Sequence, residues 1–260
     1  MEMLVLAVAF MTACASPAPP GSAPPASVTV FAAASLRDAF EEVAIAYEEE
    51  TSTAIVVSFD ASSALRAQIQ QGAPADLFAS ADTRNAAILA DAGLLDGEPV
   101  NFAGNLLTIV VPAAYPADIE SPADLADDGV SIVSAGDEVP ITQYATEAVE
   151  RMGMLEGYPA GYADAVEANI VSREDNVRAV AAKIELGEGD AAIVYATDAV
   201  AAGDAVTSIA IPSAANVPAT YAAGVVGGSD AATHAHDLLE WLLGPEGQAI
   251  LEANGFTAAP

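Results

Sequence analysis

Two strand patterns in the first third of the chain each lead into a serine at the start of a helix pattern. The β-branched residues of 28–31 precede Ser35, and those of 55–59 precede Ser62. Backbone amides in the first turn of a helix lack partners within the helix and lie at its positive end, so a serine there adds a hydroxyl to a set of anion-binding donors. If the two strands are parallel neighbours, both helix starts lie at one edge of the sheet and can bind a single anion.

From residue 28 onward, strand patterns alternate with helix patterns, which predicts an α/β fold with largely parallel sheets. We expect strands at 28–31, 55–59, 76–80, 106–111, 130–134, 191–195 and 221–226. We expect helices at 36–50, around Leu65 and Ile69, and at 83–92, 140–152, 174–186, 237–243 and 245–253. Because the succession restarts in mid-chain and ends in a return strand, we expect two lobes, one of residues 28–107 with 222–260 and one of residues 108–221.

The N-terminal residues indicate export. An apolar run over residues 3–11 leads into Thr12-Ala13-Cys14, which is typical of a bacterial lipoprotein signal in residues 1–14, with Cys14 as the lipidated first residue of the mature chain. Glu2 precedes this run where a lysine or arginine is usual, and a plain secretory signal with an incidental cysteine is the alternative. Residues 15–27 contain only Pro, Ala, Ser and Gly and form a flexible tether. We therefore expect a protein of the cell surface or periplasm that meets the membrane only through a lipid anchor.

The charge balance limits the possible partners. The chain has 7 Lys and Arg against 37 Asp and Glu, a net charge of -30. Such a field repels nucleic acids and anionic membrane surfaces, so we expect neither as a partner. Screening limits this field to about 8 Å at physiological ionic strength, so an anion site depends on the groups that line it. We expect no disulfide framework and no metal site, because Cys14 is the only cysteine and His234 and His236 do not share a helix face.

Three further segments carry a family resemblance. Residues 29–36 (TVFAAASL), 72–82 (GAPADLFASAD) and 193–199 (IVYATDA) together resemble the periplasmic molybdate-binding proteins of ABC importers, and the similarity extends from Val28 to Phe256. The resemblance implies a type II periplasmic-binding-protein fold whose two lobes close on a tetrahedral oxyanion, molybdate or tungstate. It also implies a monomer without a cofactor, whose partner is the membrane permease of an importer.

The resemblance further implies five ligand-binding positions. Ser35 and Ser62 would each offer a hydroxyl and a backbone amide. Residues 139–145 (VPITQYA) and 175–178 (DNVR) align with two motifs of the family, which places backbone donors at Ile141 and Val177. Tyr195 would donate its phenol hydroxyl. The chain departs from the family at Ile141-Thr142, where Ala-Gly is usual, so the shape of this corner is open.

All five proposed groups are uncharged donors, which suits the few cations of the chain. A dianion that leaves water needs fixed donors in place of its hydration shell, and each hydrogen bond to a charged group contributes about 1.5–3 kcal/mol. A donor-only site favours fully ionised molybdate, tungstate or sulfate over phosphate that retains a proton. A sulfate-binding protein, a serine hydrolase and the ligand-sensing half of a regulator are the alternatives. The hydrolase is disfavoured because neither serine lies in a Gly-x-Ser-x-Gly turn, and we expect no catalytic residues.

Overall fold

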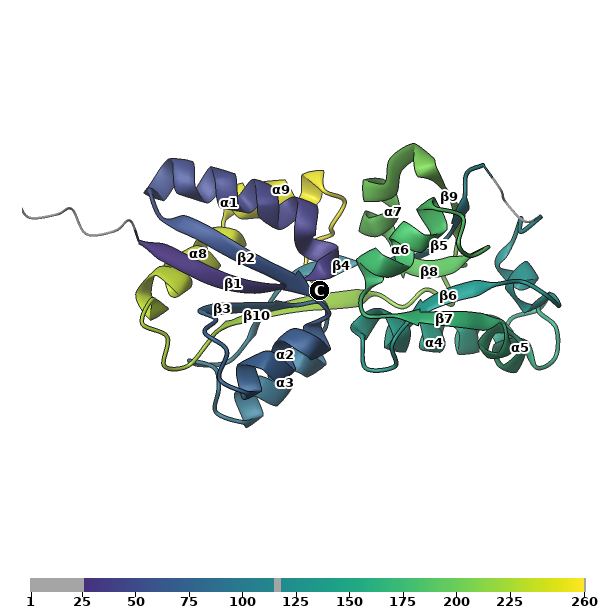
Figure 1. Ribbon diagram of the computed structural model, residues 1–260, viewed down its shortest axis with the longest axis horizontal. Coiled ribbons are helices and arrows are strands. Elements are labelled where there is room, and N and C mark those ends of the chain that lie inside the picture. The colour runs from purple at the N-terminus through teal and green to yellow at the C-terminus, as the bar shows by residue number, and fades with distance from the viewer. Residues whose placement is uncertain (1–25, 115–117, 260) are drawn as a thin grey trace, which may run out of the picture.

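The computed structural model describes residues 26–114 and 118–259. Figure 1 shows an elongated molecule in which two groups of helices and strands lie side by side, each with its own sheets. We call them the first lobe, which contains the N-terminal strands and C-terminal helices, and the second lobe, built from the middle of the chain. The signal, the tether up to residue 25 and Cys14 lie outside the described residues.

The first lobe is built on a five-stranded sheet with the order β2-β1-β3-β10-β4. β1 pairs in parallel with β2 and β3, whereas β10 is antiparallel to β3 and β4. The strands are β1 (Ser27–Ala33), β2 (Ala54–Asp60), β3 (Leu77–Ser80), β4 (Val100–Asn105) and β10 (Ala219–Val225).

Helices cover both faces of this sheet (Figure 1), because the side chains of β1 alternate between two apolar clusters. Val28 and Val30 pack with the cluster of α1 and α8, whereas Phe31 packs with the cluster of α2 and α3. The helices are the 3-10 turn η1 (Ala34–Leu36), α1 (Arg37–Thr51), α2 (Ser62–Gln70), α3 (Thr83–Asp91), α8 (Ala232–Leu243) and α9 (Pro245–Ala253). No helix in the described ranges is long and apolar enough to cross a bilayer.

The second lobe has a three-stranded sheet β8-β5-β9 and a parallel pair β6-β7, joined by a bridge between Ile132 and Ala191. In Figure 1, α6 and α7 cover one face and α4 and α5 the other. The strands are β5 (Leu107–Pro112), β6 (Ile132–Ala135), β7 (Ile170–Glu174), β8 (Ala192–Tyr195) and β9 (Val206–Ala210). The helices are η2 (Pro122–Ala126), α4 (Pro140–Gly153), α5 (Tyr162–Ala168), α6 (Val177–Glu185), α7 (Ala196–Ala202) and η3 (Gly203–Ala205).

The α/β fold class is confirmed, but the expectation of largely parallel sheets is wrong for the strands that cross between lobes. β5 is antiparallel to β8 and β9, and β10 is antiparallel to both of its neighbours. β5 and β10 each enter their lobe at the edge of the sheet that faces the other lobe. The parallel strands of each lobe end at that edge, so the entering strand is antiparallel to them. The exact lobe boundaries stay a prediction; β10 begins at Ala219, ahead of the expected return at Ala222.

Some elements differ from those expected. The helix expected from residue 174 begins at Val177, and residues 170–174 form strand β7 instead. β4, α5, α7 and β9 have no counterpart among the expected elements. β7 and β9 escape a search for apolar runs because most of their residues are exposed or half-buried.

Candidate functional site

The register of β1 and β2 brings the two serines to one edge of the first sheet. Ala33 at the end of β1 pairs with Asp60 at the end of β2, and η1 and α2 begin directly after these residues. Both serines are buried, with 2% of Ser35 and 1% of Ser62 exposed. Ser62 opens an α-helix as expected, whereas Ser35 lies in the 3-10 turn that precedes α1.

A small cavity between the lobes joins these serines to residues of the second lobe. It is lined by Ala33, Ala34, Ser35, Ala61, Ser62 and Ala81 from the first lobe and Val139, Pro140, Ile141, Asn176, Val177 and Tyr195 from the second. All five positions implied by the resemblance therefore lie on one cavity. Its volume is about 10 Å³, near the lower limit for one water, so the cavity must widen to hold a tetrahedral oxyanion.

The starts of two helices in the second lobe point their first-turn amides at this region. Pro140 and Ile141 are the first residues of α4, and Val177 is the first residue of α6. The amide of Thr142 bonds the carbonyl of Val139 at 3.0 Å, and the side chain of Asn176 caps α6 by accepting from the amide of Ala179 at 3.1 Å. Those bonds leave the amides of Ile141 and Val177 free within the described residues, as helix geometry dictates.

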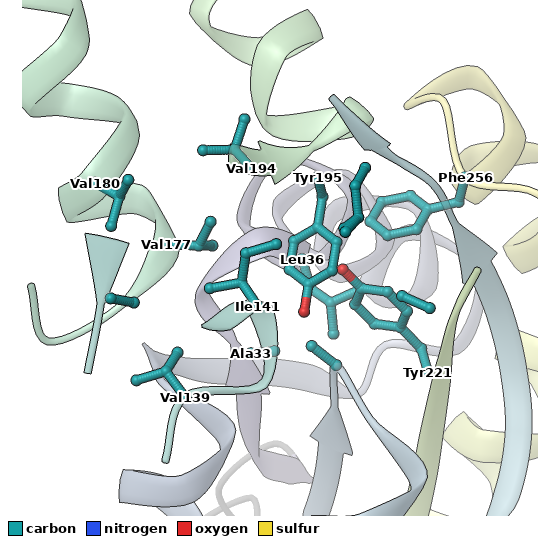
Figure 2. Packing of buried hydrophobic residues seen from close by; sticks show 14 of the residues in the cluster. Ala33, Leu36, Val139, Ile141, Val177, Val180, Val194, Tyr195, Tyr221 and Phe256 are labelled. Carbon is teal, nitrogen blue, oxygen red and sulfur yellow. The ribbon is translucent and has the colours of Figure 1, made fainter. Parts of the chain in front are cut away.

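Tyr195 supplies a hydroxyl without a partner. It ends β8, only 1% of it is exposed, and its Oη has no hydrogen-bond partner in the part of the chain that the structure describes. Figure 2 shows this hydroxyl directed toward Ala33 and Ile141. Burial raises the pKa of Tyr195 well above its usual value, so the group stays a protonated donor. An unpaired buried hydroxyl costs about 1–3 kcal/mol, which a bound acceptor would relieve.

A hydrogen-bond chain lies behind Ser35. The side-chain oxygen of Asn105 accepts from the amide of Leu106 at 2.9 Å, which orients its Nδ2 to donate to Tyr221 Oη at 3.4 Å. Tyr221 Oη and Ser35 Oγ lie 2.9 Å apart in a hydrogen bond in which either hydroxyl can be the donor; when Tyr221 donates, the proton of Ser35 is available to the cavity. Sequence reasoning missed Tyr221 and Asn105, which act through Ser35 rather than by lining the cavity.

Ser62 also makes a hydrogen bond within the first lobe. Its Oγ accepts a hydrogen bond from the amide of Ala81 at 3.0 Å, so its own proton is available to a guest. The structure thus presents two serine hydroxyls, one phenol and several first-turn amides around one point. None of the described residues that line the cavity is charged.

The charged and titratable groups near the site lie elsewhere. Asp60 at the end of β2 does not line the cavity, and its carboxylate accepts from the amide of Ala61, the N-cap residue of α2, at 2.8 Å. His236 contacts Asp96 at 3.1 Å on the exposed surface of the first lobe. Within the described residues no group of three or more His, Cys, Asp or Glu side chains could hold a metal ion.

A larger cavity of about 300 Å³ lies within the second lobe, between α4, α5 and the β6-β7 pair. Its walls are mainly apolar, with Val133, Val149, Val166 and Ile193 among them. It contains none of the expected ligand positions. The small cavity between the lobes is therefore the candidate binding site.

Comparison with known proteins agrees with this architecture. A family model for bacterial extracellular solute-binding proteins matches residues 28–257. The molybdate-binding protein ModA of Mycobacterium tuberculosis H37Rv is 36% identical over 255 residues, which are 96% of this chain and 93% of that protein.

Two solved structures share the fold at low identity. The periplasmic molybdate-binding protein of Azotobacter vinelandii has a TM-score of 0.74 and 21% identity, covering 90% of this chain and 100% of that one. The sulfate-binding protein SubI of Mycobacterium tuberculosis has a TM-score of 0.79 and 20% identity, covering 90% of this chain and 87% of that one. The chain therefore belongs to the bacterial extracellular solute-binding proteins and is a member of the ModA family.

Proposed function

We propose that this protein captures molybdate, and tungstate with it, outside the cytoplasm and delivers it to the permease of an ABC importer. The observation that carries the proposal is the donor-only cavity, in which Ser35, Ser62, Ile141, Val177 and the unpartnered hydroxyl of Tyr195 converge from both lobes. The donors replace the hydration shell of a dianion, and the helix starts supply positive potential without a cation.

The guest is held by closure of the two lobes. Because the donors come from both lobes, the anion binds the closed form better than the open form and shifts the equilibrium by that difference in affinity. The closed form is then the shape that the permease receives. We further propose that the chain acts as a monomer, without a cofactor or enzymatic activity, and is anchored through a lipid on Cys14.

The Ile141-Thr142 departure changes the shape of the site without adding a polar group. The hydroxyl of Thr142 donates to the carbonyl of Ala135 at 3.0 Å, inside the second lobe. Ile141 remains 2% exposed and adds apolar bulk beside the amide that we assign to the anion. This corner is therefore where we expect selectivity among oxyanions to be set.

Sulfate is the second candidate, since it is also a fully ionised tetrahedral dianion. Phosphate is disfavoured, because at neutral pH it retains a proton that needs an acceptor and the described lining contains no carboxylate. A serine hydrolase is not supported, because Ser35 bonds to Tyr221 and Ser62 to the Ala81 amide rather than to a base.

Titration calorimetry with molybdate, tungstate, sulfate and phosphate tests the proposal. We expect one site per chain, tight binding of molybdate and tungstate, and binding at least tenfold weaker for sulfate and phosphate. A preference for sulfate would instead support the second candidate function, sulfate binding. Heat from none of the four anions would overturn the proposal.

A further inference from the structure

The first turn of α6 contacts the first lobe on both sides of Val177. The residue before it, Asn176, donates from Nδ2 to Asp60 Oδ1 at 3.2 Å. The residue after it, Arg178, forms an ion pair with Asp38 of α1. The helix start that we assign to the anion is therefore tied to the opposite lobe by two carboxylates that lie outside the cavity.

Arg178 also lies close to a carboxylate of its own lobe. Its Nε lies 3.0 Å from Oδ1 of Asp198, a residue of α7 that is fully buried. The contact with Asp198 lies within the second lobe, and the terminal nitrogen Nη2 meets Asp38 of the first lobe. The side chain of Arg178 is 23% exposed, against 42% for Arg151, which pairs with Glu147 within α4.

This contact differs from the other ion pairs of the molecule. Within residues 26–114 and 118–259, the pair of Arg178 and Asp38 is the one that joins the two lobes; the others lie within a lobe. With only 7 Lys and Arg in the chain, a cation at the lobe interface next to a ligand-binding helix start is a specific feature rather than one of many surface pairs.

We propose that Arg178 is a positioning residue that latches the closed form of the protein through Asp38 and so strengthens oxyanion binding without contacting the anion. This inference rests on the proposed function. The Arg178–Asp38 ion pair and the full set of anion donors form only in the closed form. Each interaction therefore stabilises the closed form that the other needs. Removing the latch reduces the population of the closed form, and the apparent affinity falls in proportion.

Asp38→Asn tests the latch, because it keeps the shape of the side chain and removes its charge. Glu41→Gln is the matched control: Glu41 lies one turn further along α1 and pairs with Arg37 of the same helix at 3.7 Å. We expect Asp38→Asn to weaken molybdate binding by about three- to tenfold, mainly through faster release, and Glu41→Gln to leave the affinity within about twofold of the parent. Arg178→Gln should have a similar effect, and adding Asp38→Asn to it should weaken binding little further.

Lobe closure without ligand provides an independent measurement. Dyes on Ile45→Cys and Leu186→Cys, both at exposed positions in different lobes, report the distance between lobes in a Cys14→Ser background. We expect Asp38→Asn to shift the ligand-free protein toward the open form and Glu41→Gln not to do so. If Asp38→Asn matches Glu41→Gln in both affinity and closure, the latch is refuted. If the parent binds none of the anions, the proposed function fails, and the ligand-free distances alone decide whether the latch exists.

Discussion

Replacing Tyr195 by phenylalanine should change stability and ligand binding in opposite directions. In the closed form without ligand the hydroxyl is buried without a partner among the described residues, so its removal should leave the free energy of unfolding unchanged or raise it by up to about 1–3 kcal/mol. In the complex the same hydroxyl donates to a dianion, a bond that contributes about 1.5–3 kcal/mol. Tyr195→Phe should therefore weaken molybdate binding by roughly 10- to 150-fold.

Tyr162→Phe is the matched control. Tyr162 is buried to the same extent, but its hydroxyl donates to the carbonyl of Pro122 at 2.6 Å, far from the cavity between the lobes. It should lower the free energy of unfolding by about 0.5–1.5 kcal/mol and leave molybdate affinity unchanged. Chemical denaturation measures the first quantity and titration calorimetry the second. A Tyr195→Phe protein that binds molybdate as the parent does would refute the assignment of this hydroxyl to the ligand.

Three further predictions concern the serines, pH and salt. Ser35→Ala and Ser62→Ala should each weaken molybdate binding about tenfold or more, whereas Ser63→Ala, outside the cavity, should not. If Ser35→Ala and Ser62→Ala both bind molybdate with the parental affinity, the site lies elsewhere. Burial raises the pKa of Asp198 from 3.8 to about 7, with the Arg178 guanidinium opposing the shift, so the folded protein binds a proton that the unfolded chain has released. The free energy of unfolding should therefore decrease as pH rises from about 4 through 7, and Asp198→Asn should flatten this slope in denaturation curves; an unchanged slope contradicts the assignment. Finally, raising NaCl from 0.1 to 1 M shortens the Debye length from about 10 to about 3 Å. The screening of repulsion within a chain of net charge -30 should raise the melting temperature. An unchanged melting temperature would show that self-repulsion is unimportant.

The sequence predicts best those parts of the fold where burial leaves a strong pattern. The strands at 28–31 and 55–59 and the apolar run of β5 are found because their residues are β-branched or buried on both faces. β7 and β9 are missed because they lie at the margins of their sheets and expose residues such as Val171, which is 63% exposed. Antiparallel crossing strands are also missed, since direction depends on which edge of the sheet the chain enters.

The residues of the candidate site also divide into those that the sequence pattern predicts and those that it does not. The serines follow from local pattern, because a strand that ends at a helix start places them at the sheet edge. Ile141 and Val177 would act through backbone amides, which no side-chain pattern reveals, and the family resemblance alone pointed to them. Tyr221 and the pair of Asp38 with Arg178 depend on contacts between residues more than one hundred positions apart, so only the folded chain shows them.

Anomalous diffraction at the molybdenum edge, from crystals grown with molybdate, tests most directly the claim that uncharged donors from both lobes hold the anion. The account predicts one strong peak in the cavity between the lobes, within hydrogen-bond distance of the oxygens of Ser35, Ser62 and Tyr195 and the amides of Ile141 and Val177. A peak at another place, or an anion neutralised by a lysine or arginine side chain, would contradict it.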